Sequence, residues 1–177
     1  MKSALIISGN LAQDHEFIYP YYRLLEENFN VHVCLNEGEK VKGILGTDIP
    51  PNKNQKILSA EDVEVDKYNF LVLPGGVKAM EKVRQNKKII EIIKQFDAQK
   101  KVIACICSGA QLLISAKVVK GRNISGYYSM MDDLINAGAN YVDEKSVVDN
   151  NIITTAHYKD MGPWMKSALE VFYKKNN

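Results

Sequence analysis

Lys101 to Ser115 reads KVIACICSGAQLLIS, and this stretch decides the fold. Val102 to Ile106 is a short apolar run with the length and β-branched content of a buried strand. The run ends at Cys107, a serine and a glycine follow, and Ala110 to Ala116 is typical of an apolar helix. A residue at such a sharp strand-to-helix turn has its side chain lifted above the sheet. Cys107 is therefore the candidate nucleophile.

The position of Cys107 also predicts a reactive thiol. Unpaired N–H groups and the positive end of the helix dipole stabilise a thiolate at a helix N-terminus. We therefore expect the pKa of Cys107 to lie well below the free value of about 8.5, and iodoacetamide to label it first. Cys105 and Cys34 are expected to be ordinary buried cysteines, because free cysteine is among the most buried residue types.

Composition favours one domain spanning residues 1–177, which is long enough to bury a sizeable core. A net charge of +2 is too small to indicate a nucleic acid or an anionic membrane as partner. No apolar stretch approaches membrane-spanning length. The apolar run within the first ten residues, MKSALIISGN, is too short for a signal peptide. Three cysteines without an export signal favour a cytoplasmic location. Cys105 and Cys107 have no further ligands at zinc spacing, so no metal site is expected.

Strands alternate with helices along the chain, which predicts an α/β fold. We expect a doubly wound, flavodoxin-like and mainly parallel sheet in a three-layer α/β/α sandwich, with a small β-hairpin. The predicted strands are Ser3–Ile7, Val31–Leu35, Phe70–Leu73 and Val102–Ile106, and the hairpin pairs Ser146–Val148 with Ile152–Thr155.

The predicted helices have recognisable boundaries. Asp14 is a candidate N-cap for a helix that begins at His15. Ala79 to Phe96 is expected to be helical with an interruption near Asn86, and the last helix to start near Pro163. Residues 36–67 have the weakest pattern, and we expect them to supply part of the wall of any pocket.

Three loops follow the predicted strands: Gly9 to Glu16, Pro74 to Gly76, and Cys107 to Gly109. In open sheets of this kind, ligands bind at the carboxyl ends of the strands. The three loops are therefore expected to meet and form the site.

Four segments carry a family resemblance: HEFIYPYYRL, NFLVLPGG, VIACICSGAQLL and KGRNISGYYSMMDDLINAGANYVD. With these segments in order over nearly the whole chain, the sequence resembles the ThiJ/PfpI family, also called the DJ-one family, of the class I glutamine amidotransferase-like superfamily. The resemblance implies a small-molecule substrate, no cofactor, and a homodimer or larger homo-oligomer with the site near the interface.

The resemblance also implies the chemistry of the site. Cys107 occupies the nucleophile position, and Glu16 the position of a carboxyl group that hydrogen-bonds the cysteine sulfur. Such a carboxyl is expected to be protonated, because donation to a thiolate favours the charged sulfur. Gly75 and Gly76, with the backbone N–H of Ser108, match the positions that bind a developing oxyanion.

The sequence departs from the family at its histidines. The peptidase-like branch has histidine directly after the cysteine, where this chain has Ser108. The DJ-one branch has histidine at the position of Tyr127, which is here a candidate substrate-binding residue. His157 follows the predicted hairpin and is the candidate replacement. His15 is the other candidate, but we expect it to be an ordinary surface histidine.

The resemblance implies a cysteine-dependent enzyme that acts on reactive carbonyls, as a glyoxalase- or deglycase-like hydrolase or hydratase, through a Cys107 thiolate assisted by Glu16. One alternative is a redox-sensing or chaperone-like stress protein with an oxidisable Cys107. Another is an intracellular cysteine peptidase, which the missing histidine at Ser108 disfavours. Glutamine amidotransfer is less favoured, because it needs a late His–Glu pair and a synthetase partner.

Overall fold

A seven-stranded sheet forms the centre of the computed structural model, which describes residues 2–176. Its strand order is β10-β11-β7-β6-β1-β2-β5, and every neighbouring pair is parallel except β10 and β11, the predicted hairpin. The strands are β1 (Ser3–Ser8), β2 (Asn30–Leu35), β5 (Ile57–Leu58), β6 (Phe70–Leu73), β7 (Val102–Ile106), β10 (Val147–Asp149) and β11 (Ile152–Thr155). The predicted doubly wound, mainly parallel fold is confirmed.

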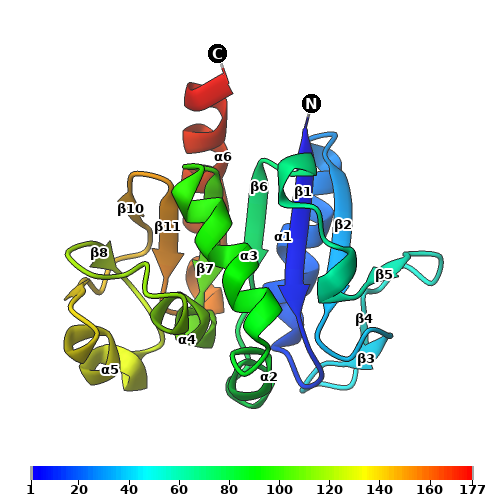
Figure 1. Cartoon of the computed structure of the whole chain (residues 1–177), viewed down its shortest axis with the longest axis horizontal. Coiled ribbons are helices and arrows are strands. Elements are labelled where there is room, and N and C mark those ends of the chain that lie inside the picture. Colours follow the sequence, from blue (N-terminus) through cyan, green and yellow to red (C-terminus); the bar gives the residue numbers. More distant parts are fainter. Residues whose placement is uncertain (1, 177) are drawn as a thin grey trace.

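The chain reverses its direction of winding at β1. After β1 it adds β2 and β5 on one side, and then β6, β7 and β11 on the other. The border between β1 and β6 is thus a topological switch point, where the loops at the carboxyl ends diverge and leave a crevice. These ends lie along the lower side of the sheet in Figure 1.

Helices cover both faces of the sheet (Figure 1). One face carries α2 (Val77–Val83), α3 (Lys87–Ala98) and α4 (Ala110–Ser115), and the other carries α1 (Asp14–Glu26) and α6 (Met161–Asn176). Beyond the β10 edge, α5 (Met131–Asn136) contacts the small sheet of β8 (Asn123–Ile124) and β9 (Asn140–Tyr141). A two-stranded ribbon of β3 (Val41–Lys42) and β4 (Asp48–Ile49) lies in residues 36–67.

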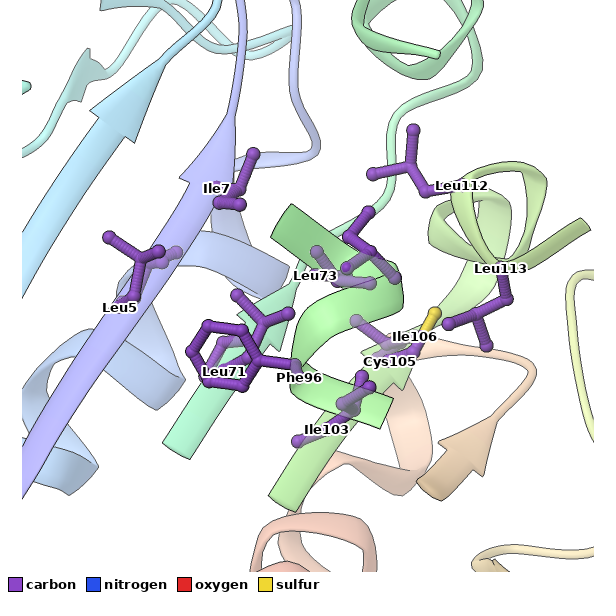
Figure 2. Packing of buried hydrophobic residues seen from close by; sticks show 14 of the residues in the cluster. Leu5, Ile7, Leu71, Leu73, Phe96, Ile103, Cys105, Ile106, Leu112 and Leu113 are labelled. Atoms are coloured by element: carbon purple, nitrogen blue, oxygen red, sulfur yellow. The ribbon is translucent and has the colours of Figure 1, made fainter. Parts of the chain in front are cut away.

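The central strands are buried on both faces, as their continuous apolar sequences require. Figure 2 shows Leu71 of β6 and Ile103 of β7 beside Phe96 of α3, and all three are fully buried. The sulfur of Cys105 lies among these apolar side chains near Leu113 of α4. Cys105 is 1% exposed, so the expectation of a buried cysteine is confirmed.

The start of α1 differs from the sequence prediction. Gln13, not Asp14, is the N-cap, and its side chain accepts hydrogen bonds from the N–H groups two and three residues later. Asp14 is the first helical residue, and its carboxylate instead accepts from the N–H groups of Leu45 and Thr47. These bonds pin the loop after β3 to the start of α1, which a local capping rule does not anticipate.

The other helix boundaries lie close to the predictions. Asn86 separates α2 from α3 and caps α3 by accepting from the N–H groups of Lys88 and Ile89. The last helix, α6, is anchored by Trp164, whose indole N–H donates to the carbonyl of Ile153 at 3.1 Å. Among residues 2–176, no helix combines the length and apolar character needed to cross a membrane.

Candidate active site

Cys107 forms a strained elbow between β7 and α4. Its φ is 57°, a left-handed value that a residue with a Cβ adopts only at a cost. Close packing holds the turn: a Cβ on Gly109 would lie 2.6 Å from the carbonyl oxygen of Leu73, at the end of β6. The Cys107 carbonyl also accepts from the N–H of Tyr127 at 3.2 Å. The expected strained backbone at a strand–helix turn is confirmed.

Glu16 lies beneath this elbow, in the first turn of α1, and is fully buried. Its Oε2 accepts the Gly75 N–H at 2.8 Å. A Cβ on Gly75 would lie 2.4 Å from that oxygen and 2.9 Å from the Cβ of Cys107. Only glycine at this position therefore lets the carboxyl group and the cysteine approach each other.

This contact changes the role expected for Gly75. Its N–H group is committed to Glu16, so it orients the carboxyl group and does not face an incoming oxygen. Gly76, at φ 101°, packs its backbone against the loop before α1, where a Cβ would lie 2.6 Å from the nitrogen of Gln13. Outside the helices and strands of residues 2–176, the N–H groups of Gly76 and Ser108 donate to no backbone carbonyl, and the Ser108 N–H hydrogen-bonds the Cys107 sulfur. Gly76 and Ser108 therefore remain the candidates for binding an oxyanion.

The electrostatics of the pair differ from the expectation. Burial raises the pKa of Glu16 to about 7, although the Gly75 N–H and the Cys107 thiol lower it by hydrogen bonding. Burial, and then the charge of Glu16, raise the pKa of Cys107 to about 12, while Ser108 lowers it by hydrogen bonding. The predicted depressed pKa of Cys107 is therefore wrong.

The physical reason is that burial outweighs the helix dipole. Cys107 is 9% exposed, and α4 is only six residues long. Glu16 Oε1 is buried without a nitrogen or oxygen partner among the described residues, and the thiol is its polar neighbour. Ionising both groups would place two negative charges side by side in a largely buried site. The pair therefore passes from two protons to one as the pH rises through about 7, and the sulfur keeps the remaining proton.

A pocket of about 420 Å³ opens above the elbow. Its wall combines the loop before α1, the starts of α2 and α4, and the segment around Tyr127. The lining residues include Gln13, Glu16, Ile44, Gly76, Val77, Cys107, Ser108, Gln111, Tyr127, Ser129, Met130, His157 and Tyr158. Ile44 belongs to residues 36–67, so the expected contribution of that region to the pocket wall is confirmed.

The structure brings His157 to this pocket and leaves His15 outside it. His157 Nδ1 accepts the N–H of Lys159 at 3.2 Å. The neutral ring that accepts this bond carries its hydrogen on Nε2, so His157 can donate a hydrogen bond through that atom. His15 is exposed, hydrogen-bonds Gln13 and lies 5.4 Å from the Tyr158 ring.

Two pocket residues that sequence reasoning missed are Gln13 and Gln111. Gln111 follows Cys107 by four positions, so helical spacing alone would have placed both on one face. No spacing rule would have pointed to Gln13, because its place as the N-cap becomes clear only when the first residue of α1 is known. No group of three or more His, Cys, Asp or Glu residues within positions 2–176 is arranged to hold a metal ion.

Comparison with known proteins identifies the family. The sequence profile of the DJ-1/PfpI family matches residues 2–171. The chain belongs to the DJ-1/PfpI family. It is 38% identical over 167 residues to Deglycase PfpI of Pyrococcus furiosus, covering 94% of this chain and 97% of the relative. It is 33% identical over 176 residues to General stress protein 18 of Bacillus subtilis, covering 98% and 99% of the two chains.

Solved structures of family members share the fold. Drosophila melanogaster DJ-1beta superposes with a TM-score of 0.85 at 28% identity, covering 96% of this chain and 90% of that one. A two-domain protein from Anabaena variabilis, with DJ-1/ThiJ/PfpI-like and ferritin-like domains, gives a TM-score of 0.88 at 29% identity. That match covers 96% of this chain and 48%, or about half, of the two-domain protein.

Proposed function

We propose that this family member is a cysteine-dependent enzyme that acts on a reactive carbonyl, in the manner of a deglycase or glyoxalase. The observation that carries the proposal is the strained Cys107 elbow, with the buried Glu16 carboxyl beside it, at the floor of an open pocket. Strain at a non-glycine residue persists where function needs the geometry. The deglycase name of the Pyrococcus furiosus relative supports the same reaction class.

The raised pKa values suggest how the thiol is activated. Glu16, with a pKa of about 7, is the group that exchanges protons near neutrality. As the Cys107 sulfur adds to the carbonyl carbon, its proton passes to Glu16 and the π electrons of the carbonyl move onto its oxygen. Glu16 then returns the proton to that oxygen, which completes a hemithioacetal with atoms and charges balanced. In the adduct of a 2-oxoaldehyde, transfer of the proton on that carbon to the neighbouring ketone carbon gives a 2-hydroxy thioester on Cys107. Water then adds to the thioester carbon and the C–S bond breaks, which releases a 2-hydroxy acid and returns Cys107 as a thiol.

The charge that develops on the carbonyl oxygen needs donors. The N–H groups of Gly76 and Ser108 are suited to this role, and each such donor contributes about 3–4 kcal/mol in comparable sites. His157 also lines the pocket, and its ring centroid lies 6.4 Å from that of the 37% exposed Tyr127. Both are proposed to orient the substrate and not to remove a proton.

Turnover measurements on a panel of 2-oxoaldehydes, isonitriles and peptides test the proposal. Cys107→Ala should abolish turnover, because no covalent adduct forms. Glu16→Gln should reduce it by about 10²–10⁴-fold, the usual size of an acid–base contribution. His157→Ala should cost far less than Glu16→Gln if His157 only orients. Full activity of Cys107→Ala on the true substrate would refute the proposal.

The redox-sensing alternative is less well supported. Peroxide oxidises the thiolate, and burial keeps the Cys107 thiol protonated. Peroxide titration without turnover of any carbonyl would favour that alternative over ours, in line with the stress-protein name of the Bacillus subtilis relative. The peptidase alternative is disfavoured because the pocket, at about 420 Å³, is small for an extended peptide.

We also propose that the protein works as a homodimer or larger homo-oligomer in the cytoplasm. Apolar side chains of α1 and α6, among them Tyr22, Leu25 and Met161, surround a groove of about 630 Å³ beside His15. Tyr22 and Leu25 are exposed, at 53% and 41%. A second copy would bury such a surface close to the site. A monomer in light scattering at micromolar concentration would contradict the assembly.

A further inference from the structure

The turn between β3 and β4, residues 43–47, contributes to the wall of the active-site pocket, and we call it the strap. Figure 1 shows β3 and β4 on the lower side of the molecule, toward the carboxyl ends of the strands. Ile44 of the strap lines the pocket, although its side chain is 53% exposed. Apart from Gly43, every residue of the strap is exposed or half-buried. Packing alone therefore does little to hold this wall in place.

Hydrogen bonds to the first residues of α1 and the loop before them hold the strap instead. The Ile44 N–H donates to the carbonyl of Ala12 at 2.9 Å. The Asp14 carboxylate accepts the two other bonds, with Oδ2 2.8 Å from the Leu45 nitrogen and Oδ1 3.1 Å from the Thr47 nitrogen. Both oxygens of this one side chain are thus bonded to the strap, on either side of its tip.

The Asp14 carboxylate is a buried charge that the strap stabilises. Its side chain is nearly inaccessible, in a residue that is 2% exposed. Burial raises the pKa of Asp14, but the bonds from Leu45 and Thr47 outweigh burial and hold the pKa below its ordinary value. The group is therefore ionised at neutral pH, and hydrogen bonds to an ionised acceptor are stronger than those between neutral groups. Gly43 packs against the same carboxylate, because a Cβ there would lie 2.2 Å from Oδ1.

The mechanism gives Asp14 no role, yet it lies two residues before Glu16 in the first turn of α1. One helical turn therefore carries the acid group beside Cys107 and also the anchor of the strap. We propose that Asp14 is a positioning residue that fixes Ile44 in the pocket wall, so that the strap limits the size of the molecules that reach Cys107. The inference takes from the proposed function only that Cys107 is the reacting group.

Alkylation of Cys107 by a small and a large reagent measures this access without turnover. Iodoacetamide is the small reagent and fluorescein-5-maleimide the large one, and mass spectrometry of the labelled peptides gives both rates. If the large reagent reaches Cys107 only when the strap is displaced, its rate follows the displaced population. Asp14→Asn keeps one acceptor oxygen and loses the other. The rate with fluorescein-5-maleimide should rise about 5–15-fold, as expected for one lost hydrogen bond, while the rate with iodoacetamide changes less than about twofold.

Ile44→Ala changes the same wall directly and should also raise the rate with the large reagent alone. In the Ile44→Ala background, Asp14→Asn should add less than about twofold, because both changes open one wall. Asp48→Asn is the matched control. It removes an exposed carboxylate of β4 that pairs with Lys42 and not with the strap, and both rates should stay unchanged.

Hydrogen exchange gives an independent check on the anchor, since the N–H groups of Leu45 and Thr47 should lose protection in Asp14→Asn. If Asp14→Asn fails to fold by circular dichroism, Gly43→Ala replaces it, because the added Cβ displaces the strap from Asp14. Equal acceleration of both reagents overturns the inference, as do an unchanged rate with the large reagent or full additivity in the double variant. Absence of turnover with every carbonyl refutes the proposed reaction alone, because alkylation is measured separately.

Discussion

Replacing Glu16 with glutamine should stabilise the protein at alkaline pH while impairing its chemistry. The side chain is fully buried, and burial raises its pKa from 4.5 to about 7. Glutamine has nearly the same volume, its oxygen can still accept the Gly75 N–H, and its NH₂ can face the Cys107 sulfur. The substitution therefore removes the ionisation and little else.

The sign and size of the effect follow from linkage. A carboxyl group whose pKa is higher in the folded state binds its proton more tightly there. Its contribution to the free energy of unfolding is complete below about pH 4.5 and is lost as the pH rises through about 7. Each pKa unit corresponds to roughly 1.4 kcal/mol, so ionisation of Glu16 costs the folded state about 3 kcal/mol by pH 8. Glu16→Gln avoids this cost.

Urea unfolding at pH 4.5 and pH 8 provides the assay. The two proteins should have similar free energies of unfolding at pH 4.5, and Glu16→Gln should be more stable by up to about 3 kcal/mol at pH 8, with an unchanged m-value. Titrating groups that do not contact Glu16 contribute equally to both proteins, and the Cys107 thiol, whose pKa burial raises, stays protonated in the folded protein at both pH values, so the difference reports on Glu16. Glu26→Gln is the matched control, because its side chain is on the same helix and 74% exposed. Parallel pH curves for wild type and Glu16→Gln would refute the reasoning.

Two further predictions concern the elbow. Gly75→Ala should lower stability by about 1–3 kcal/mol and turnover at least 100-fold, because its Cβ would lie 2.4 Å from the Glu16 carboxyl. The control is Gly162→Ala, whose Cβ would meet nothing within 4 Å and which should retain wild-type turnover. Iodoacetamide should label Cys107 before Cys105 and Cys34, since burial raises the pKa of all three and only Cys107 lines the pocket. Mass spectrometry of the labelled peptides checks the order, and equal labelling of all three would contradict it.

The sequence was sufficient to predict the elements that local pattern determines. The β-branched run before Cys107 and the small residues after it predicted the elbow, because a buried strand and a helix joined so closely leave one sharp turn. The break at Asn86 was likewise readable, since an asparagine that caps a helix acts on the N–H groups directly after it.

Local sequence pattern could not predict the hydrogen bonds that a residue makes with a segment far away along the chain. Asp14 has the composition of an N-cap, yet its carboxylate binds the loop at Leu45 and Thr47, more than thirty positions away along the chain. Gly75 was expected to bind an oxyanion, yet its N–H is taken by Glu16. In both cases the sequence predicted the kind of hydrogen bond that the residue makes, but not its partner. The partner depends on how the loops pack in the folded protein.

The pKa of Cys107 is the clearest example of a property that the local sequence could not predict. The sequence led us to expect two influences on the thiol, the helix that follows it and a hydrogen bond from a protonated Glu16, and both would lower the pKa of Cys107. The opposing influences come from elsewhere: α1 brings the Glu16 carboxyl, and the loop after β6 closes over both groups. A helix dipole contributes at most about 2 kcal/mol, whereas burial of a charged group can shift a pKa by several units, so the distant contributions set the sign. The protonation of the thiol is therefore set by the Cys107–Glu16 pair as a whole, and not by the helix that follows the cysteine.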